Sequence, residues 1–138
     1  MENFAIKECG GVSFGEILSL YESAGWINYT KRPQMLAAAL ENSLRTLGAF
    51  EGESGRLVGI IRVVGDGFSI IYIQDLIVLG EYQRRGVGSV LVAEIDKFYP
   101  DVYQKVMLTD DSPSLAAFYQ NCGFTFAGER SCKAFIKV

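Results

Sequence analysis

The sequence of 138 residues contains no histidine. This absence excludes a Ser-His-Asp triad, a Cys-His pair and the commonest zinc ligand sets, so proton transfer must use carboxylate, tyrosine, cysteine, lysine or water. Only three cysteines occur, and their wide spacing contains no Cys-x-x-Cys motif, which favours free, mostly packed thiols. We therefore expect no metal centre and no disulfide framework.

Long apolar runs and excess positive charge are also missing. No segment approaches the roughly 20 apolar residues of a membrane helix, and the first residues lack the pattern of a signal peptide. A net charge of −3 and a pI of about 5.0 argue against a nucleic-acid partner, because such domains usually carry a basic face. The sequence thus favours a cytoplasmic protein without nucleic-acid or membrane partners.

The composition of 49% hydrophobic and 21% charged residues predicts a single globular domain over residues 1–138. Periodicity and turn residues predict an α+β (α/β) fold with strands at 3–8, 47–51, 57–64, 70–79 and 102–109 and helices at 14–24, 33–44, 87–98 and 113–122. The aromatic segment 26–31 is expected to be a loop. The tail 124–138 is expected to form a further strand or hairpin.

The stretch 70–91 carries the most informative pattern, an apolar strand followed by a glycine turn, residues 83–88, and a helix-period segment. Gly86 and Gly88 permit a tight backbone bend and a close approach by a ligand. The first N–H groups of a helix that starts there lack helical partners and carry the positive end of the helix dipole. The pattern predicts a phosphate or pyrophosphate site.

Two nucleotide-binding motifs do not match this turn. A Walker A loop needs Gly-x-x-x-x-Gly-Lys-Ser/Thr, which the chain lacks. A dinucleotide fingerprint needs a third glycine three residues after Gly88, where Leu91 stands. The hairpin-connected strands before the turn also differ from an opening βαβ unit.

The turn resembles the Gln/Arg-x-x-Gly-x-Gly/Ala motif of the GCN5-related N-acetyltransferase (GNAT) family. The later segment 117–124, with Tyr119 ahead of Gly123 and Phe124, resembles that family's Tyr-x-x-x-Gly-Phe segment. The resemblance implies the GNAT fold, a mixed and mostly antiparallel sheet splayed between two parallel strands and flanked by about four helices. It also implies direct transfer of an acetyl group from acetyl-CoA to a primary amine, here expected on a small molecule.

The resemblance also implies which residues hold the cofactor. The backbone of residues 84–89 would bind the pyrophosphate, that is Arg84, Arg85, Gly86, Val87, Gly88 and Ser89. The main chain of Leu76, Ile77 and Val78 would bind the pantetheine and polarise the thioester carbonyl. Ser112 stands where many family members place a cofactor-contacting Asn, although a serine there is also a good helix N-cap.

Two residues are predicted to move protons. By the resemblance Tyr119 protonates the departing thiolate, with simple core packing of its ring as the alternative. Asp75 interrupts an apolar strand beside the thioester-binding segment, which makes it the candidate general base. The alternatives for Asp75 are a carboxylate bonded to backbone or to an arginine, or one that binds the substrate's ammonium.

Several functional questions stay open at this point. The aromatic segment from Trp26 to Tyr29 lies where family members recognise the acceptor, but Trp26 could equally belong to the core. A non-catalytic acyl-CoA-binding regulatory module and a protein or peptide N-terminal acetyltransferase are the alternative functions. The sequence leaves the oligomeric state undecided, a homodimer included.

Overall fold

The computed structural model describes residues 3–138 and consists of two compact units, Met1–Leu108 and Thr109–Val138. The first unit contains all five strands of the described chain. Its elements follow in the order β1 (Phe4–Glu8), η1 (Cys9–Gly11), α1 (Phe14–Ser23), α2 (Ile27–Thr30), α3 (Pro33–Glu41), β2 (Arg45–Glu51), β3 (Leu57–Gly65), β4 (Ile70–Val78), η2 (Gly80–Tyr82), α4 (Val87–Phe98) and β5 (Gln104–Met107). The second unit contains α5 (Pro113–Asn121) and η3 (Ala127–Arg130).

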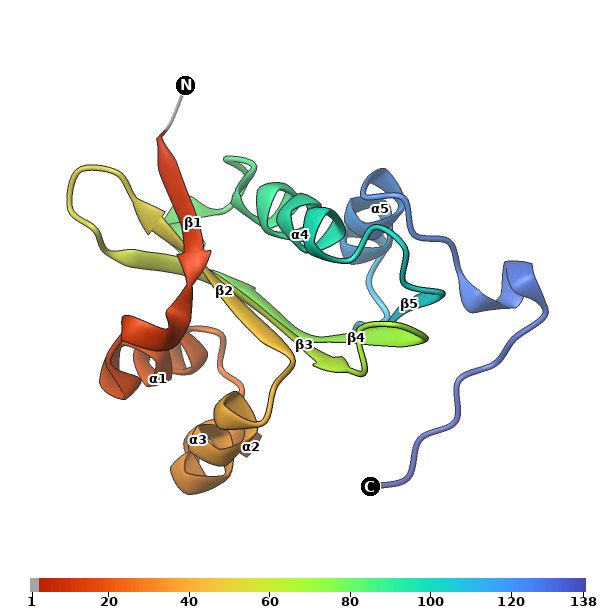
Figure 1. Ribbon diagram of the computed structural model, residues 1–138, viewed down its shortest axis with the longest axis horizontal. Helices are drawn as coiled ribbons and strands as arrows, with labels where there is room; N and C mark the ends of the chain where they lie inside the picture. The colour runs from red at the N-terminus through yellow and green to blue at the C-terminus, as the bar shows by residue number, and fades with distance from the viewer. Residues whose placement is uncertain (1–2) are drawn as a thin grey trace. The chain divides into compact units, whose positions relative to one another are not determined.

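The five strands form one sheet in the order β1-β2-β3-β4-β5, as Figure 1 shows. The first four strands pair antiparallel, and only β4 and β5 run parallel. This arrangement confirms the predicted mixed, mostly antiparallel sheet. The parallel pair lies at the edge of the described sheet rather than inside it, because no strand of the described chain follows β5.

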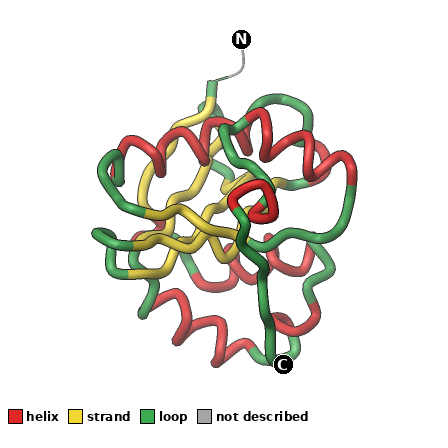
Figure 2. The backbone as a smooth tube through the Cα atoms, turned by 90° about the vertical axis from the view of Figure 1, so that its right-hand side faces the viewer, coloured by secondary structure: helices red, strands yellow, loops and turns green. Residues whose placement is uncertain are grey.

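Helices cover both faces of the sheet within the first unit. Helices α1, α2 and α3 lie on one side and α4 on the other (Figure 1), and the side view shows the strands as a layer between helices (Figure 2). Strand β3 is consequently buried from Leu57 to Val63 on both of its faces. Strand β4 alternates instead, with Ile71, Ile73, Asp75 and Ile77 buried.

The first helix begins where the sequence predicts. The Ser13 side chain accepts a hydrogen bond from the Glu16 backbone N–H over 3.2 Å, as an N-cap should. The Glu16 carboxylate does not complete a capping box, because it accepts a bond from the Leu57 N–H on β3 over 3.1 Å. Helix α1 is thereby tied to the sheet at its first turn.

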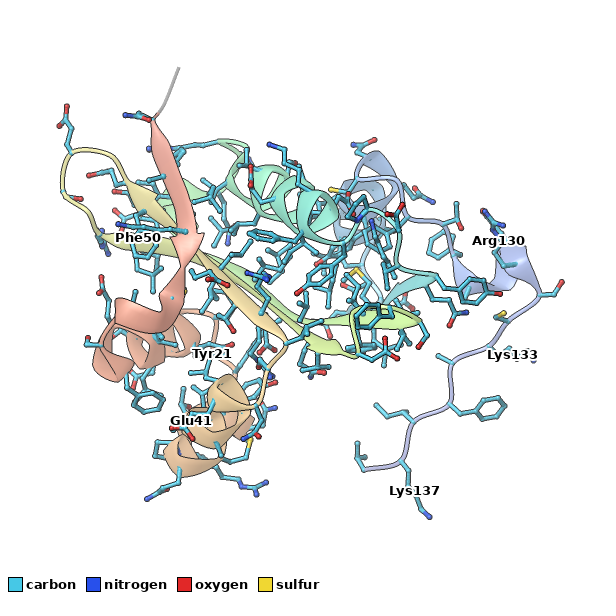
Figure 3. The ribbon with its side chains drawn as sticks, in the orientation of Figure 1. Tyr21, Glu41, Phe50, Arg130, Lys133 and Lys137 are labelled. Carbon is cyan, nitrogen blue, oxygen red and sulfur yellow. The ribbon has the colours of Figure 1, made fainter. Side chains whose placement is uncertain are left out.

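Two predictions about irregular segments are wrong. The expected loop at 26–31 contains the short helix α2, and the expected strand or hairpin at 124–138 contains a 3₁₀ turn and no strand. The tail side chains spread away from their backbone (Figure 3), and Phe135 is 92% exposed. A strand needs a hydrogen-bonded neighbour, and no described strand pairs with the tail.

Candidate functional site

The glycine turn ends in a helix start whose N–H groups are available. Gly86 adopts a left-handed conformation with φ of 85° and precedes the first residue of α4 as an N-cap without a side-chain hydrogen bond. The first backbone bond of the helix runs from the Val90 N–H to the Gly86 carbonyl, over 3.0 Å. The N–H groups of Val87, Gly88 and Ser89 therefore lie outside the helical ladder, at the positive end of the dipole.

The space beside this helix start is open. No heavy atom lies within 4 Å of the position that a Cβ would occupy on Gly86. Arg84 also has a positive φ, 63°, which turns the backbone in the same short loop. A pyrophosphate group fits this combination of open space, a bent backbone and unpaired N–H groups.

A second glycine holds α4 close to the sheet. A Cβ on Gly59 of β3 would lie 3.1 Å from Cγ1 of Val87 and 3.3 Å from Cδ1 of Leu91. Only a residue without a side chain allows the helix to pack this closely on β3. Gly59 therefore sets the height of the helix start above the neighbouring strand β4.

Strand β4 has one free edge in its second half. It pairs with β3 from Ile71 to Val78, but its pairing with β5 covers only Ile70–Ile73. The Leu79 N–H donates to the Val58 carbonyl of β3, over 2.9 Å. Because alternate residues of an antiparallel strand face the same edge, Leu76 and Val78 present their N–H and C=O groups to the free edge.

The same alternation places the main chain of Ile77 differently from that of its two neighbours. The Ile77 main chain faces β3, with its carbonyl oxygen only 3.3 Å from the Gly59 Cβ position. The Ile77 side chain is buried in the core between α1 and the sheet. Of the three predicted residues, Leu76 and Val78 thus direct their main chain to the free edge, whereas the main chain of Ile77 faces β3.

A cavity of about 300 Å³ lies at this free edge. The Gln83 side chain spans from the glycine turn to the strand and donates to the Val78 carbonyl over 3.0 Å. The cavity joins the end of α1, the strand and the turn, and its lining consists of Ser23, Ala24, Trp26, Leu76, Ile77, Val78, Gly80 and Gln83. The structure thus brings together the predicted pantetheine strand and the beginning of the predicted pyrophosphate turn.

The two arginines of the turn are both exposed. The Arg85 guanidinium lies 5.1 Å from the centre of the Tyr82 ring, a cation–π distance. The Tyr82 hydroxyl donates to the Glu51 carboxylate over 2.5 Å, which fixes the ring beneath the arginine. The positive charges of Arg84 and Arg85 therefore stand next to the helix start, where an anion would bind.

Asp75 lies inside a dense hydrogen-bond network and not in the cavity. Its side chain is 1% exposed, and its Oδ2 accepts from the Tyr21 hydroxyl and from Nε of Arg62, each over 2.7 Å. Its Oδ1 accepts from the Tyr29 hydroxyl over 3.0 Å. Arg62 is itself buried and also donates to Tyr29 and to Ser43, each over 3.1 Å.

The electrostatics of the network are those of a closed ion pair. Burial opposes the charge on Arg62, but the Asp75 carboxylate more than offsets it, and the net effect raises the pKa of Arg62. Burial, followed by the Asp75 charge, raises the pKa of Tyr21, whose place is labelled in Figure 3. The geometry favours the alternative for Asp75 in which an arginine and hydroxyls hold the carboxylate, because a base must reach its substrate.

The aromatic segment before α3 divides between core and cavity. Tyr29 is 7% exposed and belongs to the network, whereas Ile27 is 60% exposed. Trp26 is half-buried and lines the cavity, with its ring 6.1 Å from that of Tyr21. Of the four residues from Trp26 to Tyr29, only Trp26 stands beside the predicted thioester segment.

Tyr119 lies on α5, in the second unit. Its ring packs edge-on against Phe118 and Phe124, at centroid distances of 4.9 and 6.0 Å. Among the residues that the structure describes, its hydroxyl has no hydrogen-bond partner. Burial raises the pKa of Tyr119 to about 12, so the phenol keeps its proton at neutral pH.

Ser112 caps α5, as one of its two interpretations requires. Its Oγ accepts from the Leu115 N–H over 3.4 Å and lies 3.0 Å from the Ser114 hydroxyl. Within residues 3–138 no cluster of three or more potential metal ligands occurs. None of the helices described there is long and apolar enough to span a membrane.

Comparison with known proteins agrees with this geometry. The family model of the acetyltransferase (GNAT) domain matches residues 17–138. An acetyltransferase of the GNAT family from Streptococcus pneumoniae shares 36% sequence identity and superposes with a TM-score of 0.87, over 99% of this chain and 98% of that chain. The match extends across nearly the full length of both chains.

Two curated relatives are named as uncharacterized N-acetyltransferases. The ycf52-like protein of Prochlorococcus marinus is 31% identical over 126 residues, which cover 88% of this chain and 68% of that protein. The ycf52 protein of Gracilaria tenuistipitata is 28% identical over 118 residues, 82% of this chain, and the match spans only 62% of the relative. These matches agree with the geometry of the site, in which a helix start open to a pyrophosphate follows a strand with a free edge. The chain belongs to the GNAT acetyltransferase family.

Proposed function

We propose that this protein transfers an acetyl group from acetyl-CoA directly to a primary amine of a small molecule. The observation that carries the proposal is a cavity at the free edge of β4 that is also lined by Gln83, the first residue of the turn that leads into α4. The two features suit the two ends of one ligand, an extended amide-containing arm and a pyrophosphate. Their separation along the chain is short, from Leu76 to Ser89.

The chain's own groups would hold this ligand in three ways. The N–H groups of Val87, Gly88 and Ser89 bind the pyrophosphate, and the exposed arginines of the turn add positive charge. The main chain of Leu76 and Val78 bonds the amides of the arm, as an added half-strand would. The Gln83 amide, which already binds the Val78 carbonyl, fixes the edge of the strand at this point.

The reaction needs a thioester carbonyl to become more electrophilic and an amine to lose a proton. Acetyl-CoA supplies the activated acetyl group. A main-chain N–H on the free edge of β4 stabilises the oxyanion that develops on the carbonyl. An alkylammonium has a pKa of about 10.4, and with Asp75 buried its proton passes to water in the cavity rather than to that carboxylate.

Tyr119 is the proposed proton donor to the departing thiolate. Its hydroxyl is not used by any other described group, and its raised pKa, about 12, keeps it protonated. The same raised pKa makes complete transfer to a thiolate with a conjugate pKa of about 8.5 unfavourable. A hydrogen bond from the phenol to the sulfur, with the final proton taken from solvent, is therefore the expected contribution.

The first experiment tests the pyrophosphate site with a matched pair of glycine variants. Gly86→Val places a branched side chain in the open space at the helix start, where φ is 85°. Gly55→Val makes the same change on the β2–β3 turn, where φ is 72° and no heavy atom lies within 4 Å of the Cβ position. Both variants carry similar backbone strain, so their difference isolates the blocked approach of the ligand.

Calorimetric titration with acetyl-CoA is the measurement. We expect Gly86→Val to weaken acetyl-CoA binding by a factor of about ten or more relative to Gly55→Val, in line with the loss of at least one charge-assisted interaction. Equal affinities in the two variants would contradict the assignment of the site. Failure of the wild-type protein to bind acetyl-CoA would overturn the proposed function altogether.

The second experiment addresses Tyr119. Tyr119→Phe should lower turnover by about a hundredfold and leave acetyl-CoA affinity unchanged. This factor is at the low end of the usual rate contribution of a general acid, because the raised pKa makes the phenol a weak acid. Tyr103→Phe is the control, since Tyr103 is 83% exposed. An unaltered turnover in Tyr119→Phe would refute the proton-donor role and leave core packing as the function of this tyrosine.

One observation favours a second candidate, a non-catalytic acyl-CoA-binding module. The only carboxylate on the buried face of β4 is occupied by three donors, which leaves the predicted base without access to an amine. Release of free CoA with a panel of primary amines separates the two functions. Acetyl-CoA binding without any amine-dependent release would support the module and refute the transferase.

A further inference from the structure

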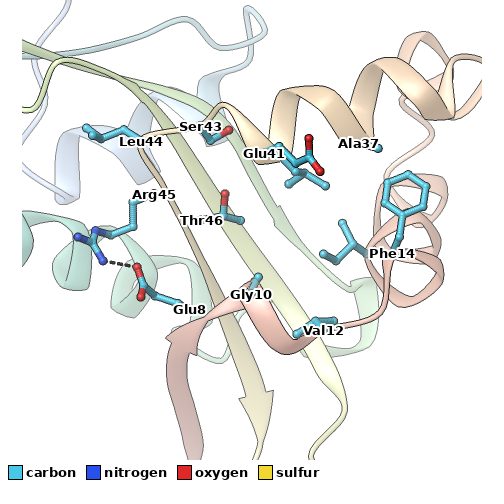
Figure 4. A pocket seen from close by; sticks show the side chains of 13 residues that line it. Glu8, Gly10, Val12, Phe14, Ala37, Glu41, Ser43, Leu44, Arg45 and Thr46 are labelled. Carbon is cyan, nitrogen blue, oxygen red and sulfur yellow. Dashed lines mark hydrogen bonds and ion pairs between the residues drawn. The ribbon is translucent and has the colours of Figure 1, made fainter.

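A larger cavity lies away from the cofactor edge. It has a volume of about 520 Å³ and opens between η1, the start of α1, the end of α3 and the start of β2 (Figure 4). None of its lining residues lines the cavity at β4. Its volume falls within the range of roughly 300–1,000 Å³ that is common for small-molecule sites.

The walls of this cavity are mostly apolar. Val12 and Phe14 form the side towards α1 (Figure 4), and Leu40 is contributed by α3. All three are only partly buried and pack against the edge of the core. A ligand with an apolar body would therefore cover hydrophobic surface that the protein itself leaves accessible.

The charges around the cavity are unbalanced. Glu8 and Arg45 at one end form an ion pair with each other. Glu41, on the last turn of α3, extends on the cavity side of its helix (Figure 4), and no described residue forms an ion pair or hydrogen bond with its carboxylate. The carboxylate also lies at the negative end of the α3 dipole, so its charge and the dipole both favour a bound cation.

A second polar group of the wall is unsatisfied. The Thr46 hydroxyl is shielded from solvent and, within the described chain, has no hydrogen-bond partner. Thr46 lies on β2 (Figure 4). Because its hydroxyl is shielded from solvent, a ligand in the cavity would not reach it, so the Glu41 carboxylate is the polar group that determines the charge of a ligand.

From the cavity, its apolar walls and the unpaired Glu41 carboxylate we propose a second ligand site, which takes a small organic ammonium compound with an apolar body. Glu41 holds the ammonium, and the apolar walls enclose the body. An anion would face the unpaired carboxylate, and a wholly apolar ligand would leave that carboxylate without a partner. The proposal concerns a different site from the acetyl-transfer cavity and does not depend on the proposed function.

The test uses the N,N-dimethylphenethylammonium ion as probe. It carries a single acidic N–H for Glu41 and an aromatic body, and as a tertiary amine it cannot yield a stable amide. Titration of the ¹⁵N-labelled full chain should shift the amide signals of Gly10, Ala37 and Thr46, which line the cavity. The signals of Leu76 and Val78 at the other cavity should stay in place.

Two variants with the same loss of charge complete the design. Glu41→Gln should weaken probe binding about fivefold, the upper end for an exposed ion pair. Glu53→Gln, at the exposed tip of the β2–β3 turn, should leave it unchanged. Ala37→Phe fills the space and should abolish the shifts, with thermal unfolding as the check that the variant is folded.

Three results would overturn the proposal. The first is the absence of any shift with the probe at millimolar concentration. The second is equal binding by Glu41→Gln and Glu53→Gln. The third is a set of shifts confined to the β4 cavity, which would place the probe in the acetyl-transfer site instead.

Discussion

Replacement of Asp75 by asparagine distinguishes a structural carboxylate from a catalytic one. The substitution keeps the shape of the side chain and removes its charge. Arg62 then retains a charge in a place where its side chain is 5% exposed, with the neutral amide as its nearest partner. The Tyr21 hydroxyl also loses its charged acceptor, which now lies 2.7 Å away.

The size of the effect follows from this burial. Removing one member of a buried ion pair typically costs about 3–5 kcal/mol, because the remaining charge is left uncompensated. Domains of this size have a total stability of about 5–15 kcal/mol, so the variant should lose a large fraction of it. At about 3–4 °C per kcal/mol, the midpoint of thermal unfolding should fall by about 10–20 °C.

The assay combines thermal unfolding and urea unfolding, both followed by circular dichroism. Turnover is measured well below the new melting point. Asp101→Asn, in an exposed turn, serves as the control and should match the wild type. The double variant Arg62→Met with Asp75→Leu should recover part of the lost stability, because it leaves no unpaired charge but still removes the acceptor of the Tyr21 and Tyr29 hydroxyls. A stable Asp75→Asn protein with a large loss of turnover would refute this reasoning and restore Asp75 as the base.

Two further predictions concern packing and pH. Gly59→Ala should lower the free energy of unfolding by about 1–3 kcal/mol and weaken acetyl-CoA binding, because its Cβ would lie 3.1 Å from Val87. Gly15→Ala on α1 is the control, since its Cβ meets no atom within 4 Å and the change should be neutral or mildly stabilising. Urea unfolding measures the stability of both variants, and calorimetry measures their acetyl-CoA binding. Burial raises the pKa of the Cys9 thiol from 9.0 to about 12, so the unfolded chain releases this proton first and stability should fall as pH rises through that window. In Cys9→Ala the free energy of unfolding should decrease less steeply with pH, by about 1.4 kcal/mol per pH unit. An unchanged pH dependence in urea unfolding at alkaline pH would contradict the burial of the thiol.

The elements predicted most accurately are those specified by local chemistry. The glycine turn and helix 87–98 appear with the expected limits, since a left-handed Gly86 and an apolar period of 3.6 residues are both visible in the sequence. The tail 124–138 shows the converse. Its alternating apolar residues suit a strand, but a strand also needs a neighbour, which local sequence does not specify.

The role of Asp75 could not be read from the sequence for a related reason. Its three donors are separated from it by 13, 46 and 54 residues along the chain. The sequence does contain one clue, since Arg62 is the single charge within the apolar strand 57–65. A charge of each sign on two adjacent buried strands is a reason to expect a pair, although the register that joins them comes only from the fold.

The hydroxyls that bind Asp75 also attach the α1–α2 segment to the sheet. Tyr21 lies on α1 and Tyr29 on α2, and both are anchored to the same carboxylate on β4. Lifting the α1–α2 segment off the sheet would break both bonds and bury no compensating surface, at about 1–3 kcal/mol for each polar group left without a partner. We therefore expect Trp26, which lies between them and lines the cavity, to keep its position when a ligand binds.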